Sequence, residues 1–448
     1  MKKILIANRG EVAVRIARAC RELGIEVVAI YSAADRDSLH TKIADQSFCI
    51  GPGPSVESYL NIPRVMSALE LSEADAVHPG YGFLSENADF AEVCEELGVQ
   101  FIGPNSDCIR TLGDKISARA LAVREEVPLL PGSQGPVTLD SLEDEAEKIG
   151  YPVILKAAAG GGGRGMKIIQ NSSELKHAFQ MAQREAQAAF GSDICFMEKY
   201  LTRPRHIEVQ VLGDGQGRCM VLGERDCSIQ RRHQKLIEEA PSPVLTSEQR
   251  EQVYGYARKM LASISYASLG TVEFLFQDGQ FYFMEVNPRL QVEHPVTEMV
   301  YGIDLVKTQI QVAAGASLPD ESQMVCRGHA IECRINAEDP FLMRPSPGLV
   351  KEWYVPGGPG VRMDSMVYSG YRVPYFYDSL LGKLIVWGQD RQEALTRMQR
   401  ALDEFKVDGV QTNTLLHQEL VADHHFQNAE VTTRFLDQFL EKRSENKI

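Results

Sequence analysis

The pattern that most restricts the fold is an alternation of short apolar runs with amphipathic helical segments in the first third of the chain. The apolar runs occupy residues 4–7, 25–31, 75–78 and 99–102. Gly24 and Gly98 end the helical segments that precede two of these runs. Strands separated by helices predict a doubly wound parallel sheet. The first turn, residues 8–11, lacks G-x-G-x-x-G, so we expect no dinucleotide site there.

The loop at residues 78–87 follows one of these predicted strands and contains Tyr81. Open α/β sheets bind ligands at the carboxyl ends of their strands, so this loop is a candidate ligand site. A turn that is rich in Gly and Pro for structural reasons alone is at least as well supported.

The bulk properties of the chain narrow its class. Its 448 residues are enough for two or three domains, and 44% hydrophobic with 24% charged residues is typical of globular proteins. A net charge of -14 argues against nucleic acid and anionic membranes as partners. The first apolar run is too short for a signal peptide and no run is long enough to span a membrane, so we expect a cytoplasmic protein. Nine cysteines without a C-x-x-C pair predict reduced thiols.

A glycine-rich segment at residues 160–165 lies between two predicted strands at 151–156 and 166–169. It predicts a flexible hairpin whose backbone N–H groups fold over phosphates, although a simple linker is the alternative. No G-K-[ST] opens a following helix, so it is not a P-loop. Prolines and glycines at residues 127–135 mark a boundary or hinge before it.

The stretch at residues 285–295 alternates polar and apolar side chains with the period of a strand. The polar positions are Glu285, Asn287, Arg289, Gln291 and Glu293. Carboxylate and amide oxygens on one face suit Mg²⁺, whereas an amphipathic strand with a solvated face is the alternative. Pro288 limits regular pairing, so we expect the strand to continue as an extended loop.

The register of the preceding hairpin tests the metal hypothesis. A two-residue Asp278-Gly279 turn would pair Glu273 with Met284 and place Glu273 and Glu285 on opposite faces. A loop of three or five residues would set the two carboxylates opposite each other. The metal hypothesis therefore predicts the odd loop.

Two further segments are rich in charge. Residues 224–235 form the densest cationic segment, which is either a solvated turn or a site that meets an anion. Residues 329–338 alternate again, and Arg334 between carboxylates predicts a surface ion pair. Short β-like runs and a helix near residues 395–405 then predict a smaller α+β unit.

Taken together, these motifs resemble the biotin carboxylase family, the ATP-grasp component of biotin-dependent carboxylases, and in particular the free-standing subunit of bacterial acetyl-CoA carboxylase. The motifs are the segments at 7–11, 78–87, 113–115, 160–166, 197–201, 231–235, 285–295 and 332–339. The resemblance implies α/β and α+β domains: a doubly wound N-terminal domain at 1–112, an ATP-grasp domain at 113–329 with a mobile Gly-rich lid at about 130–203, and a C-terminal α+β domain at 330–448.

The family implies that MgATP phosphorylates bicarbonate to carboxyphosphate, which breaks down to CO2 and phosphate before biotin is carboxylated. Such phosphoryl transfer depends on positioning and charge neutralisation. By resemblance, ATP is bound by Lys115, Lys156, Gly162, Gly163, Glu198, Lys199, Tyr200, Leu201, His206, Gln230, His233, Glu273 and Glu285. Two Mg²⁺ or Mn²⁺ ions are held by Glu273, Glu285 and Asn287.

The resemblance also assigns the two smaller substrates. Bicarbonate is held by Lys235, Arg289, Gln291, the Val292 backbone and Arg334. Glu293 matches the general base, although carboxylates beside cations have a lowered pKa and are weak bases. Arg334 also matches the residue that stabilises the biotin enolate, and Tyr81 lines the biotin pocket. The residues with catalytic roles are therefore Arg289, Glu293, Lys235 and Arg334.

No Met-Lys-Met biotinylation motif occurs, so we expect biotin to arrive on a separate biotin carboxyl carrier protein, with carboxyltransferase subunits as further partners. Relatives of this kind imply a homodimer and a role in fatty acid synthesis. The final acceptor stays open between acetyl-CoA, another acyl-CoA and pyruvate. The alternative functions are a carboxylate-amine ligase of the ATP-grasp class and a regulatory protein that binds nucleotide without catalysis.

Overall fold

The computed structural model describes residues 1–133, 135–157, 166–190, 192–231 and 234–445. The first unit is a parallel sheet of order β3-β2-β1-β4-β5. Its strands are β1 (Lys3–Ile6), β2 (Glu26–Tyr31), β3 (Gln46–Cys49), β4 (Ala76–His78) and β5 (Gln100–Phe101). Ile4 and Ile6 pack with one layer and Leu5 and Val28 with the other, as the doubly wound prediction requires. The helices are α1 (Gly10–Glu22), α2 (Leu39–Ile43), α3 (Ile62–Ser72) and α4 (Ala88–Glu96).

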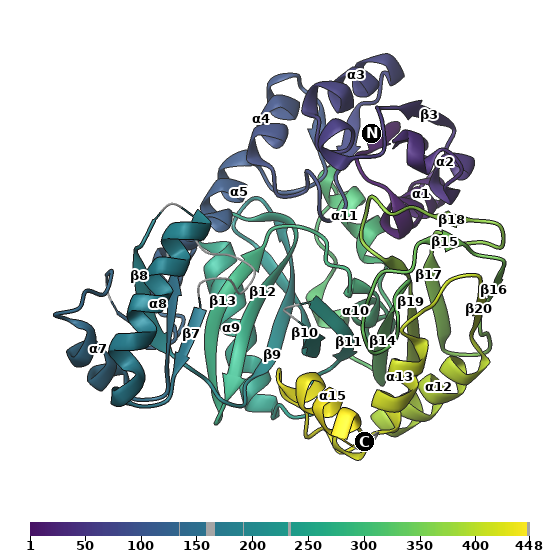
Figure 1. Ribbon diagram of the computed structural model, residues 1–448. Helices are drawn as coiled ribbons and strands as arrows, with labels where there is room; N and C mark the ends of the chain where they lie inside the picture. The colour runs from purple at the N-terminus through teal and green to yellow at the C-terminus, as the bar shows by residue number, and fades with distance from the viewer. Residues whose placement is uncertain (134, 158–165, 191, 232–233, 446–448) are drawn as a thin grey trace.

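An eight-stranded antiparallel sheet of order β13-β12-β9-β10-β11-β14-β19-β17 forms the centre of the molecule (Figure 1). Its strands are β9 (Arg205–Asp214), β10 (Cys219–Arg231), β11 (Gln234–Ala240), β12 (Ala267–Gln277), β13 (Gln280–Asn287), β14 (His329–Asn336), β17 (Val361–Ser365) and β19 (Leu380–Gly388). β11 pairs with β14, so the sheet continues across residue 330, where we expected a domain boundary.

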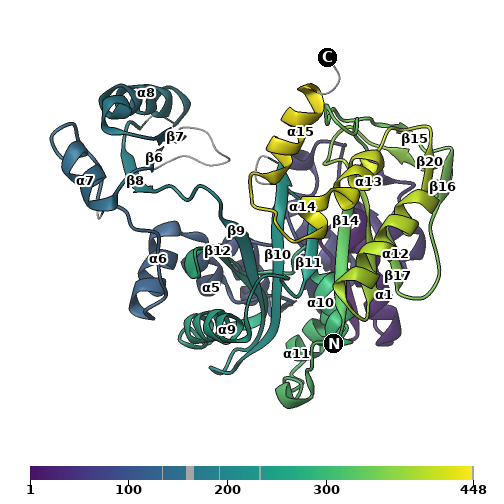
Figure 2. The same ribbon diagram turned by 90° about the horizontal axis from the view of Figure 1, so that it is seen from below.

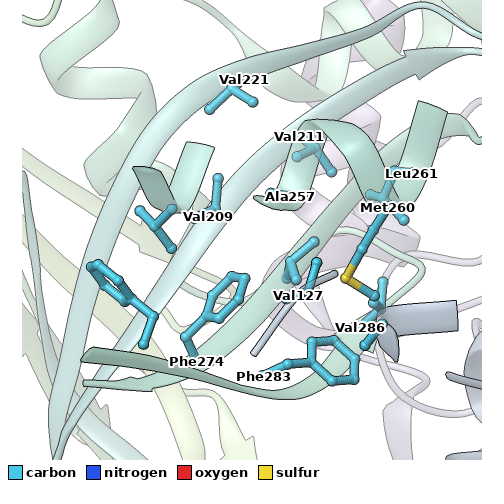
Figure 3. Packing of buried hydrophobic residues seen from close by; sticks show 14 of the residues in the cluster. Val127, Val209, Val211, Val221, Ala257, Met260, Leu261, Phe274, Phe283 and Val286 are labelled. Atoms are coloured by element: carbon cyan, nitrogen blue, oxygen red, sulfur yellow. The ribbon is translucent and has the colours of Figure 1, made fainter. Parts of the chain in front are cut away.

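One face of this sheet is apolar and covered by helices. Val209, Phe274 and Phe283 pack against Met260 and Leu261 of α9 (Ser247–Ala262), as Figure 3 shows. Farther along the sheet, the apolar face is covered by α12 (Arg391–Glu404), α13 (Thr414–Ala422) and α15 (Phe435–Glu445). The predicted core positions of the helix near residues 395–405 are buried in this layer. The opposite face carries the polar side chains of the site and, where it packs against the first unit, apolar side chains such as Leu212 and Leu269.

A small antiparallel sheet of order β7-β6-β8 projects from one side of the molecule in both ribbon views (Figures 1 and 2). Its elements are α7 (Leu142–Ile149), β6 (Val153–Ala157), β7 (Met166–Ile169), α8 (Ser172–Phe190) and β8 (Cys195–Lys199). It has its own core, in which Leu155 packs with Phe179 and Met197. The predicted glycine-rich hairpin, with Gly162 and Gly163, lies outside the described residues.

The remaining α-helices and strands are α5 (Ser106–Gly113), α6 (Lys115–Arg124), α10 (His294–Tyr301), α11 (Leu305–Ala313), β15 (Gly348–Leu349), β16 (Glu352–Tyr354), β18 (Arg372–Val373), β20 (Lys406–Asp408) and α14 (His424–Gln427). They include two small sheets, β15-β18 and β16-β20. All nine cysteines are free thiols, and seven of them lie in the core as predicted, whereas Cys49 and Cys326 are exposed. Among the described residues, no helix is long and apolar enough to cross a membrane.

The β12–β13 hairpin corrects the predicted loop length. Gln277 pairs with Gln280, so the turn is the two-residue Asp278-Gly279, with φ of 53° and 78°. The odd loop is therefore wrong. A β-bulge at Met284 supplies the extra residue instead, because Phe274 pairs with Phe283 while Glu273 pairs with Glu285. The two carboxylates consequently lie opposite each other, as the metal hypothesis requires.

Candidate active site

A row of charged side chains crosses the polar face of the large sheet. Glu285 on β13 pairs with Glu273 on β12, Glu273 pairs with Glu208 on β9, and Glu208 pairs with Arg225 on β10. Glu285 is exposed, whereas the other three are buried. Buried carboxylates are stable only when cations or hydrogen-bond donors compensate them. Arg225 provides one cation, at 2.5 Å from Glu208 Oε1.

The ammonium of Lys235 on β11 neutralises three carboxylates of this face. Its Nζ contacts Glu208 and lies 2.8 Å from Glu273 Oε1 and 2.7 Å from Glu293 Oε1. Burial disfavours the ammonium, but these carboxylates outweigh burial and raise the pKa of Lys235 well above its ordinary value. The cationic segment at 224–235 is therefore not a solvated turn, since its described residues form two paired strands.

The polar positions at residues 287–293 converge on the same place, as the alternation predicted. Strand β13 ends at Asn287, before Pro288. The Arg289 guanidinium donates from Nη1 to Gln291 Oε1 and from Nη2 to Asn287 Oδ1, both at 3.0 Å. Glu293 then lies at the amino end of α10, fully buried. A carboxylate is favoured there by the helix dipole.

Glu293 is held between two cations. Its Oε1 accepts from Lys235 and its Oε2 accepts from Arg334 Nη2 at 2.9 Å. Burial alone would raise the pKa of Glu293, but Lys235, Arg334 and Arg225 lower it well below the ordinary value. This lowering by neighbouring cations agrees with the prediction for Glu293. It keeps the carboxylate ionised at neutral pH.

Arg334 is not the surface ion pair that the sequence predicted. It is the neighbour of Glu332 and Glu238 on the polar face of β14 and β11, and its Nε donates to Glu238 Oε1 at 2.6 Å. Its side chain is only 16% exposed. Surface pairing was expected because the alternating strand alone does not show that α10 packs on this face.

We expect Glu238→Gln to change the pH dependence of stability. Burial raises the pKa of Glu238 to about 7 despite Arg334, and Glu293 adds to the rise. The neutral carboxyl therefore stabilises the fold at low pH, and this stabilisation is lost as pH rises from about 4.5 to about 7. Glutamine copies the neutral form, so the Tm of the variant relative to wild type should rise by about 1–3 °C between about pH 5.5 and 8.

Calorimetry of Glu239→Gln provides the matched control for this prediction. Although burial acts against it, His329 and Arg391 lower the pKa of Glu239 to about 2. The charge of Glu239 itself should stay constant over the same pH range, so a slope in the Tm difference of this variant reports only its histidine partner, His329. A Glu238→Gln difference that rises no more than this control would contradict the prediction.

The residues predicted to bind ATP form two groups. On the large sheet, His206 Nε2 lies 2.9 Å from Glu273 Oε2, and His206 Nδ1 lies 3.5 Å from Gln230 Nε2. On the small sheet, Glu198 pairs with Lys156 at 2.5 Å and with Arg119 at 2.7 Å.

The other predicted ATP ligands lie around these groups. Lys199 Nζ donates to the carbonyl oxygens of Gly150 and Tyr151, so its side chain anchors its own strand. Tyr200 is half-buried and Leu201 is buried. Lys115 is exposed at the start of α6, and His233 lies outside the described residues.

The predicted metal ligands fit a divalent cation. Glu273 and Glu285 are directly opposite each other, and Asn287 Nδ2 donates to Glu273 Oε1 at 3.0 Å. Although Glu285 is exposed overall, desolvation of its carboxyl group by the surrounding protein and the nearby charge of Glu273 raise its pKa. A bound Mg²⁺ would relieve this repulsion, and carboxylate and amide oxygens are its preferred ligands.

Several functional residues were missed in the sequence, including Glu208, Arg225, Glu238 and Arg119. Glu208 could have been found, because His206, Glu208 and Gln210 alternate along one predicted strand. Arg225 and Glu238 had no such signal. Their roles arise from pairing with strands that are distant in the sequence.

The fold and site define an ATP-dependent ligase of the ATP-grasp class. Residues 114–321 match the carbamoyl-phosphate synthase L chain ATP-binding domain. Residues 1–109 and 332–438 match the biotin carboxylase N-terminal and C-terminal domains. The chain belongs to the biotin carboxylase family.

Relatives match nearly the whole chain. Biotin carboxylase of Pseudomonas aeruginosa is 53% identical over 447 residues, covering 98% of this chain and 99% of the relative. A pyruvate carboxylase subunit of Methanothermobacter thermautotrophicus is 51% identical, covering 98% of this chain and 90% of the relative. The family confirms the predicted fold class and function, an ATP-dependent biotin carboxylase of the kind that opens the acetyl-CoA carboxylase reaction.

Solved structures agree with this membership. The Campylobacter jejuni biotin carboxylase complex with βγ-ATP has a TM-score of 0.92 at 47% identity and covers 98% of both chains. The biotin carboxylase domain dimer of Hydrogenobacter thermophilus 2-oxoglutarate carboxylase, with MgADP, ADP and bicarbonate, has a TM-score of 0.90 at 47% identity. It covers 98% of this chain and 97% of that one.

Proposed function

We propose that this chain uses MgATP and bicarbonate to carboxylate biotin that is carried on a separate protein. The observation that carries the proposal is the position of Glu293, fully buried between the ammonium of Lys235 and the guanidinium of Arg334. A carboxylate-amine ligase needs the metal carboxylates but has no evident use for this arrangement beside Arg289.

The proposed first step is the activation of bicarbonate. Lys235, Arg289, Gln291, the Val292 backbone and Arg334 hold the anion, and a planar guanidinium matches its two oxygens. Glu293 accepts the bicarbonate proton at a carboxylate oxygen, and the resulting dianion attacks the γ-phosphate of ATP. Because the pKa of Glu293 is lowered, its positioning must compensate for weak basicity.

The proposed ATP site faces both sheets. Lys115, Lys156 and His206 contact phosphates, residues 198–201 hold the adenine, and Gln230 is a further ATP ligand. The proposed ATP ligands Gly162, Gly163 and His233 lie outside the described residues. Glu273, Glu285 and Asn287 hold two Mg²⁺ or Mn²⁺ ions, which neutralise phosphate charge when bound. Lys156 and Glu198 pair with each other in the structure, so ATP binding would compete with that pair.

The biotin step uses the other end of the site. Arg334 stabilises the enolate of the biotin ureido group, and Tyr81 lines the pocket.

We also propose the domain bounds 1–112, 113–329 and 330–448, with a mobile lid at about 130–203. The match boundaries near residues 109, 114, 321 and 332 support this division.

The proposed setting is a cytoplasmic homodimer that works with a biotin carboxyl carrier protein and carboxyltransferase subunits in fatty acid synthesis. A dimer is named for the Hydrogenobacter thermophilus relative. Acetyl-CoA is the proposed final acceptor, since several relatives are plain biotin carboxylases. Pyruvate or another acyl-CoA is the second candidate, because a relative from a pyruvate carboxylase is about as similar.

The test measures ADP release from MgATP with and without bicarbonate and with and without a high concentration of free biotin. We expect turnover that requires bicarbonate and rises with biotin. Turnover that is unchanged when bicarbonate is removed would indicate a different ligase. Nucleotide binding without turnover in any mixture would indicate a regulatory protein.

A further inference from the structure

Lys383 on β19 has a fully buried ammonium at a junction of three parts of the chain. It pairs with Arg334 on β14 and with Asp364 on β17, so it belongs to the polar face of the large sheet. Its Nζ lies 2.8 Å from the Val292 carbonyl oxygen and 2.9 Å from Glu11 Oε1. Its side chain is 0% exposed. The contacts inside the protein therefore account for its charge without any contact to a substrate.

Glu11 extends this contact toward the biotin end of the site. It lies in the first turn of α1 and is buried. Its Oε1 accepts both from Lys383 and from the hydroxyl of Tyr81. Contacts therefore run without a break from Tyr81 through Glu11 and Lys383 to Val292.

The surrounding charges keep Lys383 as a cation paired mainly with Glu11. Burial alone would lower the pKa of Lys383, but Glu11, Glu332 and Asp364 raise it. Asp364 has its own partner, because Arg362 donates to both of its oxygens. Burial raises the pKa of Glu332 well above its ordinary value, which makes that carboxyl a weaker partner for Lys383 than Glu11.

We propose that Lys383 is a positioning residue for both substrates of the proposed biotin carboxylase reaction. Its bond to the Val292 carbonyl fixes the peptide that leads into Glu293, the proposed base. Its ion pair with Glu11 fixes the acceptor that orients the Tyr81 hydroxyl. Lys383 thereby aligns the end of the site that binds bicarbonate with the end that binds biotin. The inference rests on the proposed function.

The test is steady-state kinetics of Lys383→Met with ATP, bicarbonate and free biotin varied in turn. We expect the KM for bicarbonate and the KM for biotin each to rise about tenfold, the effect of one lost charge-assisted hydrogen bond. The KM for ATP should change less than about twofold, because the residues around His206 and Lys156 do not contact Lys383. Such a selective pattern would not follow from a general loss of folded protein.

Removing Lys383 leaves Glu11 buried without its cation, so the single variant is paired with Lys383→Met/Glu11→Gln. The double variant removes both charges and should regain thermal stability. Its KM for bicarbonate should stay raised because the Val292 contact is still absent, and its KM for biotin because the ion pair that fixes the acceptor of Tyr81 is absent. Glu11→Gln alone keeps that contact, so it should raise the KM for biotin more than the KM for bicarbonate.

Arg391→Met is the matched control. Arg391 pairs with buried Glu239 at 2.7 Å, and Glu239 lies on β11 next to Glu238 but on the opposite face. This variant should lose stability without a selective change in either KM. Unchanged bicarbonate and biotin KM values in Lys383→Met, or an equal rise for ATP, would overturn the inference. Absence of bicarbonate-dependent turnover in wild type would instead overturn the proposed function.

Discussion

Glu293→Gln is expected to lower bicarbonate-dependent ADP release by about 10³-fold. Glutamine has nearly the same shape, and its single amide oxygen can still accept from either Lys235 or Arg334, but it cannot take the proton from bicarbonate. Loss of a positioned general base typically costs about 10²–10⁴ in rate. The measurement is ADP release at saturating MgATP over a range of bicarbonate concentrations.

The pH profile sharpens this prediction. Lys235 and Arg334 lower the pKa of Glu293 against the effect of burial, so the base stays ionised when pH falls from 8 to 6. Wild-type turnover should therefore show no loss between pH 8 and pH 6 that comes from protonation of Glu293. Any loss in this range should be the same in Glu293→Gln. Glu239→Gln, a buried carboxylate on the opposite face, should keep nearly full activity. Glu293→Gln activity within tenfold of wild type would contradict the assignment of the base.

Lys235→Met is expected to abolish turnover and to lower the free energy of unfolding by about 3–5 kcal/mol. Lys235 is the shared cation of Glu208, Glu273 and Glu293, all of them buried. Methionine has a similar length but leaves these carboxylates without their central positive charge. Denaturant unfolding measures the stability, and ADP release measures the activity.

A double variant separates charge balance from chemistry at this position. Lys235→Met/Glu208→Gln removes one cation and one carboxylate together, so it should recover part of the lost stability. It should not recover activity, because the proposed bicarbonate ligand is still missing. Recovery of both would show that Lys235 acts only by neutralising Glu208.

The local chemistry of the site could be read from short segments. Glu285, Asn287, Arg289, Gln291 and Glu293 alternate with apolar residues, and the structure brings their side chains together. An alternating pattern repeats every two residues along one strand, so it needs no knowledge of the partner strands. The ATP-binding roles, in contrast, came from a family resemblance and stay predictions.

The hairpin shows where such reading fails. Asp278-Gly279 forms the two-residue turn instead of the predicted odd loop, and that turn alone would have separated Glu273 from Glu285. The bulge at Met284 reverses this outcome, and a single exposed methionine carries no clear signal for a bulge. Cross-strand register depends on the pairing of two whole strands and on the core beneath them.

The sequence by itself therefore determined the doubly wound first unit, the polar face at residues 285–293 and the family to which the chain belongs. These features depend on local periodicity and on residue types in fixed order. Only the tertiary structure decided that Arg334 is largely covered, that Lys235 serves three carboxylates, and that Lys383 joins Glu11 to Val292. Such charges compensate one another across segments far apart in the chain, and their energies depend on burial and distance, which no short segment reveals.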